Sequence, residues 1–64
     1  MKNINEIDTI IANMDDTLFE RIGKAEDDAW DLDSRIARNG RRRLRYNLKK
    51  AGLTEDEWYE WCAL

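Results

Sequence analysis

The stretch "ARNGRRRLR", residues 37–45, decides how this chain folds, because it suits either the end of one helix or the middle of another. Gly or Asn directly after an apolar helical repeat is a common C-terminal cap, so the pattern favours a turn at Asn39–Gly40. The alternative is a helix that continues through this pair. Gly40 would then lie on the apolar stripe between Ile36 and Leu44, where a missing side chain permits close approach of another element.

An apolar stripe runs along the first three dozen residues, with members three or four positions apart. This is the spacing of one face of an α-helix, and it predicts a single helix over residues 4–38. Such a helix would be roughly 50 Å long. Thr17 and Glu20 have capping-box spacing, so the alternative is a break near residues 14–17. The stripe residues expected to support self-association are Ile4, Ile7, Ile11, Met14, Leu18, Ile22, Leu32 and Ile36.

Two short helices are predicted after the Asn-Gly pair. A second apolar repeat ends at Gly52 and predicts a helix over residues 41–51. Thr54 and Glu57 form a capping box, which predicts a helix over residues 55–63. The expected fold is therefore one all-α domain, in which a long amphipathic helix is followed by two short helices as a helical hairpin or small bundle.

The size of the chain favours self-association. A core of 64 residues is marginal by itself, and natural domains of this size often add disulfides, a metal or a second subunit. Cys62 is the single cysteine and histidine is absent, so an internal disulfide and imidazole metal ligands are excluded. We therefore expect a homodimer or other homo-oligomer without cofactor or metal. The sequence shows neither a signal peptide nor a membrane span, so cytoplasm is the expected compartment.

Charge is arranged in blocks. Residues 15–33 carry eight acids and two bases, residues 35–50 carry eight bases and no acid, and residues 51–64 carry four acids and no base. A hairpin that turns at residues 39–40 would pair some of these charges and gather the remaining arginines at its corner. The electrostatic partner-binding residues predicted from this block are Arg35, Arg38, Arg41, Arg42, Arg43 and Arg45.

The partner predicted for these arginines is a protein with an acidic surface. Arginine clusters also neutralise phosphates, and Tyr46 could stack on a base. The net charge of −3 is opposite to the basic footprint of a nucleic-acid-binding domain. A nucleic-acid-binding regulator that uses residues 41–50 is therefore the alternative, and a structural subunit of a larger helix bundle is the second alternative.

The aromatic end "WYEWCAL", residues 58–64, is either core or a partner anchor. Trp58 and Trp61 share one face of a helix too short to be stable alone, so docking on the rest of the chain is expected. Trp and Tyr also dominate binding hot spots, which makes Trp58, Tyr59 and Trp61 candidates for partner contact.

No catalytic residues are expected. The acids lie on what should be solvated helix faces, and Cys62 has no histidine to activate it. The sequence therefore predicts a non-enzymatic regulatory protein that docks on a larger macromolecule and modulates or inhibits it.

Overall fold

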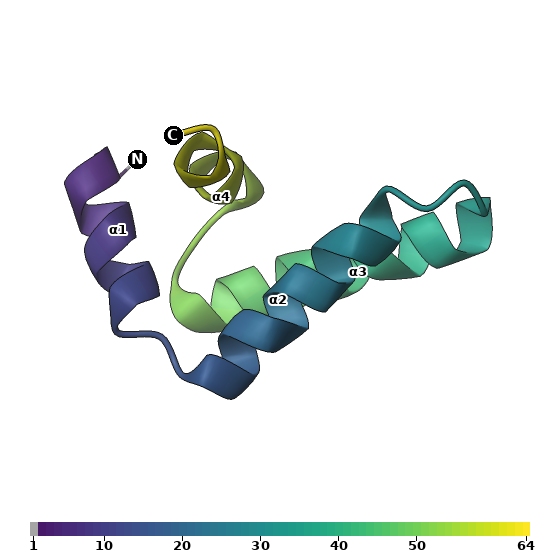
Figure 1. The fold of residues 1–64 in the computed structure, drawn as a ribbon, viewed down its shortest axis with the longest axis horizontal. Coiled ribbons are helices and arrows are strands. Elements are labelled where there is room, and N and C mark those ends of the chain that lie inside the picture. Colours follow the sequence, from purple (N-terminus) through teal and green to yellow (C-terminus); the bar gives the residue numbers. More distant parts are fainter. Residues whose placement is uncertain (1) are drawn as a thin grey trace.

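The computed structural model describes residues 2–64, and this range contains four helices and no strand. They are α1 (Ile4–Ala12), α2 (Asp16–Ala29), α3 (Ser34–Ala51) and α4 (Glu55–Cys62). Helices α2 and α3 form a long antiparallel hairpin, and α1 and α4 lie together at one end of it (Figure 1). The predicted all-α class is confirmed. No helix within residues 2–64 combines the length and apolar character that a bilayer-spanning segment requires.

The single helix expected over residues 4–38 is wrong, because the chain breaks at residues 13–15 and again at residues 30–33. The first break lies at the alternative position, although the cap is Asp15, whose Oδ1 accepts from the Thr17 N–H at 2.8 Å. At the second break, Asp33 Oδ1 accepts from the Arg35 N–H at 2.8 Å. Short acidic side chains that bond nearby N–H groups in this way compete with a continuing helix.

Folding back also covers the apolar stripe. The molecule measures 35 Å along its longest axis, which is shorter than the continuous helix expected from the sequence. Ile7 and Ile11 of α1 and Ile22 of α2 are buried in one core with Leu44 and Leu48 of α3.

The turn favoured at Asn39–Gly40 is also wrong, and the helix expected over residues 41–51 begins at Ser34 instead. Gly40 is buried in the middle of α3, against the last turns of α2. A Cβ atom at this position would lie 2.4 Å from the backbone N of Ala29 and 2.6 Å from the backbone C of Asp28. Gly40 therefore has the close-approach role of the alternative interpretation, and it sets the spacing of α2 and α3.

The C-terminal helix begins where its capping box is expected. The Glu57 N–H donates to Thr54 Oγ1 at 3.2 Å, and the Thr54 N–H donates to Glu57 Oε1 at 2.9 Å. Helix α4 ends at Cys62, compared with the expected residue 63. Gly52 ends α3 in a left-handed conformation with φ of 78°, which a residue with a side chain rarely adopts.

Most of the self-association stripe is covered by the chain itself. Ile7, Ile11 and Ile22 are buried, while Ile4, Met14 and Leu18 are partly buried against the same core. Leu32 and Ile36 remain exposed, at 103% and 41%. The six covered residues do not need a second subunit for their burial.

Candidate functional site

The six arginines predicted to contact a partner all lie on α3 and are all exposed. Because α3 runs through Asn39–Gly40, they form a helix face and not the hairpin corner that the sequence suggested. At about 3.6 residues per turn, Arg35, Arg38 and Arg42 point away from the side of α3 that buries Gly40 and Leu44. Arg41 and Arg43 lie on opposite flanks of this face.

Two of the arginines are neutralised within the chain. Arg43 forms an ion pair with Asp28 of α2, and Arg45 forms one with Glu55 of α4. Each of these exposed pairs stabilises the fold by about 0–1 kcal/mol, so their main effect is to orient neighbouring helices.

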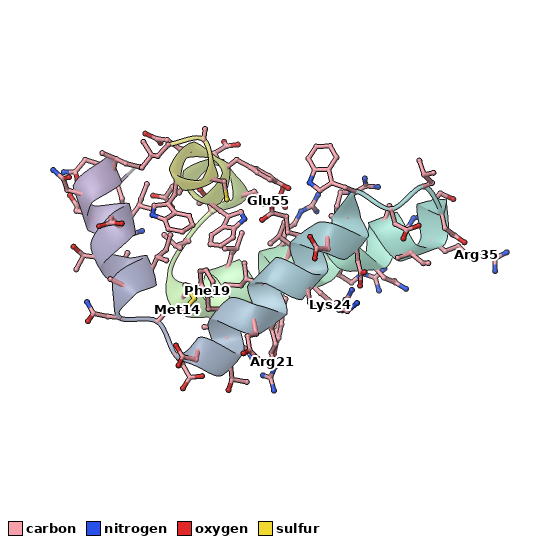
Figure 2. All side chains as sticks on the ribbon, in the orientation of Figure 1. Met14, Phe19, Arg21, Lys24, Arg35 and Glu55 are labelled. Atoms are coloured by element: carbon pink, nitrogen blue, oxygen red, sulfur yellow. The ribbon has the colours of Figure 1, made fainter. Side chains whose placement is uncertain are left out.

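The other four arginines have no carboxylate within ion-pair distance among residues 2–64. Arg35 occupies the first turn of α3, where the positive end of the helix dipole disfavours a cation. Figure 2 shows its side chain extending from the far end of the hairpin, away from α1 and α4. We call these four residues the open arginines: Arg35, Arg38, Arg41 and Arg42.

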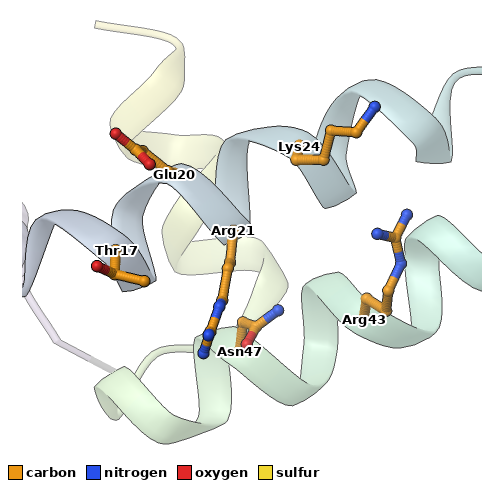
Figure 3. A pocket seen from close by; sticks show the side chains of 6 residues that line it. All are labelled: Thr17, Glu20, Arg21, Lys24, Arg43 and Asn47. Atoms are coloured by element: carbon orange, nitrogen blue, oxygen red, sulfur yellow. The ribbon is translucent and has the colours of Figure 1, made fainter.

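A groove of about 500 Å³ runs between α2 and α3 on one side of the arginine face (Figure 3). Its charges are nearly balanced. Asp28 pairs with Arg43 and lies 3.7 Å from Lys24 Nζ, and the α2 wall also carries one further acid, Glu20, and one further base, Arg21. The residues that line it are Thr17, Glu20, Arg21, Lys24, Arg43 and Asn47.

A second cleft, of about 390 Å³, lies on the other flank and is lined by Ala29, Trp30, Arg41 and Tyr59. It brings together one predicted arginine and one predicted aromatic residue, from α3 and α4. Trp30 was missed by the sequence analysis because it lies one position after Ala29 and off the apolar stripe. Its side chain is 73% exposed, which is unusual for tryptophan.

The hydroxyl of Tyr59 stays protonated at neutral pH. Partial burial raises the pKa of Tyr59, and the negative charges of Glu26 and Glu55 raise it further, while Arg41 opposes the shift. The phenol can therefore act as a neutral hydrogen-bond donor in this cleft.

Trp58 and Trp61 join α4 to the rest of the chain. Their rings stack at 5.5 Å between centroids, and Phe19 of α2 meets Trp58 edge-on at 6.1 Å. The indole N–H of Trp58 donates to Glu26, and that of Trp61 donates to Asp8 at 3.2 Å. Trp58, at 3% exposed, is therefore a core residue, and the side chain of Trp61 packs against the core.

Cys62 is a weak candidate for reactivity. Burial raises the pKa of its thiol, and the negative charge of Glu26 raises it further, so little thiolate forms at neutral pH. Among residues 2–64, no group of three or more Cys, Asp or Glu side chains is arranged to hold a metal ion.

Comparisons with known proteins found no relative of this chain. No family model matches the chain, and no curated protein or solved structure is significantly similar to it.

Proposed function

We propose that this chain is a non-enzymatic interaction protein that docks on a larger macromolecule and modulates or inhibits it. In this proposal α3 presents its arginine face to an acidic surface of a partner protein in the cytoplasm. The observation that carries the proposal is the set of four open arginines, which have no carboxylate partner among residues 2–64 although the chain as a whole is acidic.

The local structure gives no reason for these arginines. Arg35 lies at the unfavourable end of α3, and neither Arg38 nor Arg42 pairs with another helix within residues 2–64. A guanidinium group carries several N–H donors in a fixed fork that matches a carboxylate, and arginine is enriched in binding hot spots. A surface of this kind is well suited to electrostatic recognition of an acidic protein.

A matched pair of charge reversals tests the proposal. Arg38→Glu with Arg42→Glu changes the arginine face, whereas Arg21→Glu with Lys24→Glu makes the same change in charge on α2. We expect the α3 variant to lose a partner that the wild-type protein captures from its source cells, with an unchanged circular dichroism spectrum. The α2 variant should retain it. Equal capture by both variants would eliminate the arginine role.

A second candidate function is a nucleic-acid-binding regulator that uses residues 41–50. The observation in its favour is that α3, roughly 27 Å long, carries basic residues and Tyr46 on its exposed side, with Tyr46 62% exposed and Lys50 Nζ 4.6 Å from the centre of its ring. Phosphate contacts would make binding fall steeply with salt, with a log–log slope of about −0.7 to −0.9 per contact. Absence of binding to DNA and RNA at low salt would remove this candidate.

Self-association is a separate proposal. Leu32 and Ile36 are the stripe residues that stay exposed, so a homodimer would form through this end of the hairpin. Light scattering over a dilution series tests it, and a monomer at every concentration would contradict it. A structural subunit of a larger helical assembly would instead co-purify with that assembly at fixed stoichiometry.

A further inference from the structure

We propose that the cleft lined by Ala29, Trp30, Arg41 and Tyr59 is an anchor site for an acidic peptide segment of the partner protein. The segment would insert one apolar side chain between the aromatic rings and set a neighbouring Asp or Glu carboxylate on Arg41. This inference rests on the proposed docking function and specifies the partner's chemistry. We call this site the anchor cleft.

The walls of the anchor cleft come from three helices. Ala29 is the last residue of α2 and Trp30 caps it, Arg41 lies in the middle of α3, and Tyr59 lies in α4. Ala29 is 8% exposed, whereas the large indole of Trp30 is open to solvent and lacks the ring contacts that Trp58 and Trp61 make. A volume of about 390 Å³ with two aromatic walls has room for an apolar side chain together with a neighbouring acidic one.

The polar groups of the anchor cleft are mainly hydrogen-bond donors. The Arg41 guanidinium and the Trp30 indole N–H can donate but cannot accept, and the protonated Tyr59 hydroxyl can donate as well. Within residues 2–64, none of these three side chains has an acceptor in the chain. Such a site is complementary to a ligand that brings acceptors and negative charge, and a carboxylate provides both.

A peptide fits this cleft better than a nucleic acid does. Glu26 and Glu55 are close enough to Tyr59 to raise the pKa of its hydroxyl, so the cleft has acids at one side and a cation at the other. A phosphodiester chain would bring repeated negative charge toward these acids. A peptide can place one carboxylate at Arg41 and an uncharged side chain beside Tyr59.

Nuclear magnetic resonance titration of the whole chain tests the proposal. The probe is the peptide acetyl-Asp-Glu-Leu-Phe-Ser-Gly-amide, which carries its acids on one side only, and the signals are the indole N–H of Trp30 and the backbone amides of Arg41 and Tyr59. We expect all three signals to shift with one saturable curve. A peptide with Ser in place of Leu and Phe, and one with Lys in place of the acids, should each bind at least about tenfold more weakly.

Two protein variants and a control complete the test. Trp30→Ala and Arg41→Gln should each weaken binding of the probe by about tenfold or more, while Arg21→Gln in the opposite groove should leave it unchanged. All three changed side chains are exposed, so the spectra outside the mutated sites should stay the same.

The outcomes separate this inference from the docking function. If the probe shifts the amide signals of Arg38 and Arg42 but not the signals of Trp30 and Tyr59, the proposed anchor cleft is contradicted and the proposed role of the arginine face is supported. If no signal shifts at millimolar probe, the anchor cleft is wrong, and the charge-reversal experiment decides the docking function independently. If a short oligothymidylate shifts the same signals at lower concentration than the peptide, the ligand is nucleic acid and the peptide assignment fails.

Discussion

The two ends of the α2–α3 hairpin are stabilised in different ways. At the base, where α1 and α4 cover the hairpin, Leu44 and Leu48 are fully buried together with Ile7 and Ile22. At the tip, around the 30–33 turn, the helices meet through small residues. These buried small residues are Ala29, Ala37 and Gly40.

The residues that stabilise the fold and the residues proposed to contact a partner lie at different ends of the hairpin. The base gains free energy from burial of large apolar side chains, at roughly 25 cal/mol for each Å² removed from water. The tip depends on close backbone approach and leaves Trp30, Leu32 and Ile36 exposed. Large apolar side chains and open arginines therefore lie at the end of the molecule that contributes least to the core, where both are free to contact a partner.

The largest expected effect comes from a change at the base. Leu44→Ala should lower the free energy of unfolding by about 2–5 kcal/mol, because it removes a fully buried side chain and leaves a cavity. A domain of this size has a free energy of unfolding on the order of 5 kcal/mol, so the variant should be largely unfolded at room temperature. Urea denaturation followed by circular dichroism measures the effect. A loss smaller than about 1 kcal/mol would contradict the assignment of the core to the base.

The second prediction concerns the close approach at the tip. Gly40→Ala should destabilise the protein by about 1–3 kcal/mol, because the added Cβ meets the backbone of α2, which cannot move aside alone. Gly23→Ala is the matched control in a helix interior. No atom lies within 4 Å of a Cβ there, so this change should stabilise the protein by up to about 1 kcal/mol. Thermal unfolding of both variants measures these effects, and equal shifts of Tm would contradict the close packing of α2 and α3 at Gly40.

The third prediction uses Glu57, which ties the N-terminal segment to α4 at the base. Its carboxylate accepts from the Thr54 N–H and from the Lys2 N–H at 3.0 Å, and it is 2% exposed. The hydrogen bonds from Thr54 and Lys2 lower the pKa of Glu57 in the folded state, and the Lys2 charge lowers it further. Its contribution to stability is therefore complete above the unfolded pKa of about 4.3 and is lost as pH falls through the lower folded value.

Glu57→Gln should remove that part of the acid dependence and destabilise the protein at neutral pH, because the amide is a weaker acceptor. Unfolding free energies measured between about pH 7 and pH 3 would show it. Glu60→Gln, at an exposed position, is the control, and it should leave the fall of the unfolding free energy toward low pH unchanged. If wild type and Glu57→Gln lost stability identically toward low pH, the hydrogen bonds of the Glu57 carboxylate would have no energetic role.

The smallest expected effect on stability lies at the tip. Trp30→Ser and Leu32→Ser should each change the free energy of unfolding by less than about 0.5 kcal/mol, because both side chains are exposed. Trp30→Ser should also move the fluorescence emission to shorter wavelength, since the remaining tryptophans are the more buried ones. A clear loss of stability in either variant would show that the tip contributes to the core.

Local sequence signals predicted some elements well and others poorly. The Thr54–Glu57 capping box needs only neighbouring residues, and it is present at the start of α4. Asn39–Gly40 carries an equally familiar local signal, and it was wrong. A glycine after an apolar repeat serves both a helix end and a close helix crossing, and only the packing of α2 decides between them.

The candidate site was also predictable only in part, because local signals do not show which residues the fold brings together. The arginine block was evident from charge, but its division into paired and open arginines depends on Asp28 and Glu55, which only the fold brings near. Trp30 was missed because exposure is a property of the folded chain, and an aromatic residue one position off a stripe looks unremarkable in sequence.

The sequence by itself determined the helical class, the apolar stripe and the charge blocks, because helix periodicity and composition are local properties that need no knowledge of distant contacts. The tertiary structure decided where the stripe is interrupted, which face of α3 is buried, and that Trp30, Arg41 and Tyr59 line one cleft. These features depend on contacts between residues far apart in the chain. The free energy gained when helices bury apolar surface against each other adds to or opposes the local preference for a helix cap, and only the folded chain shows which is larger.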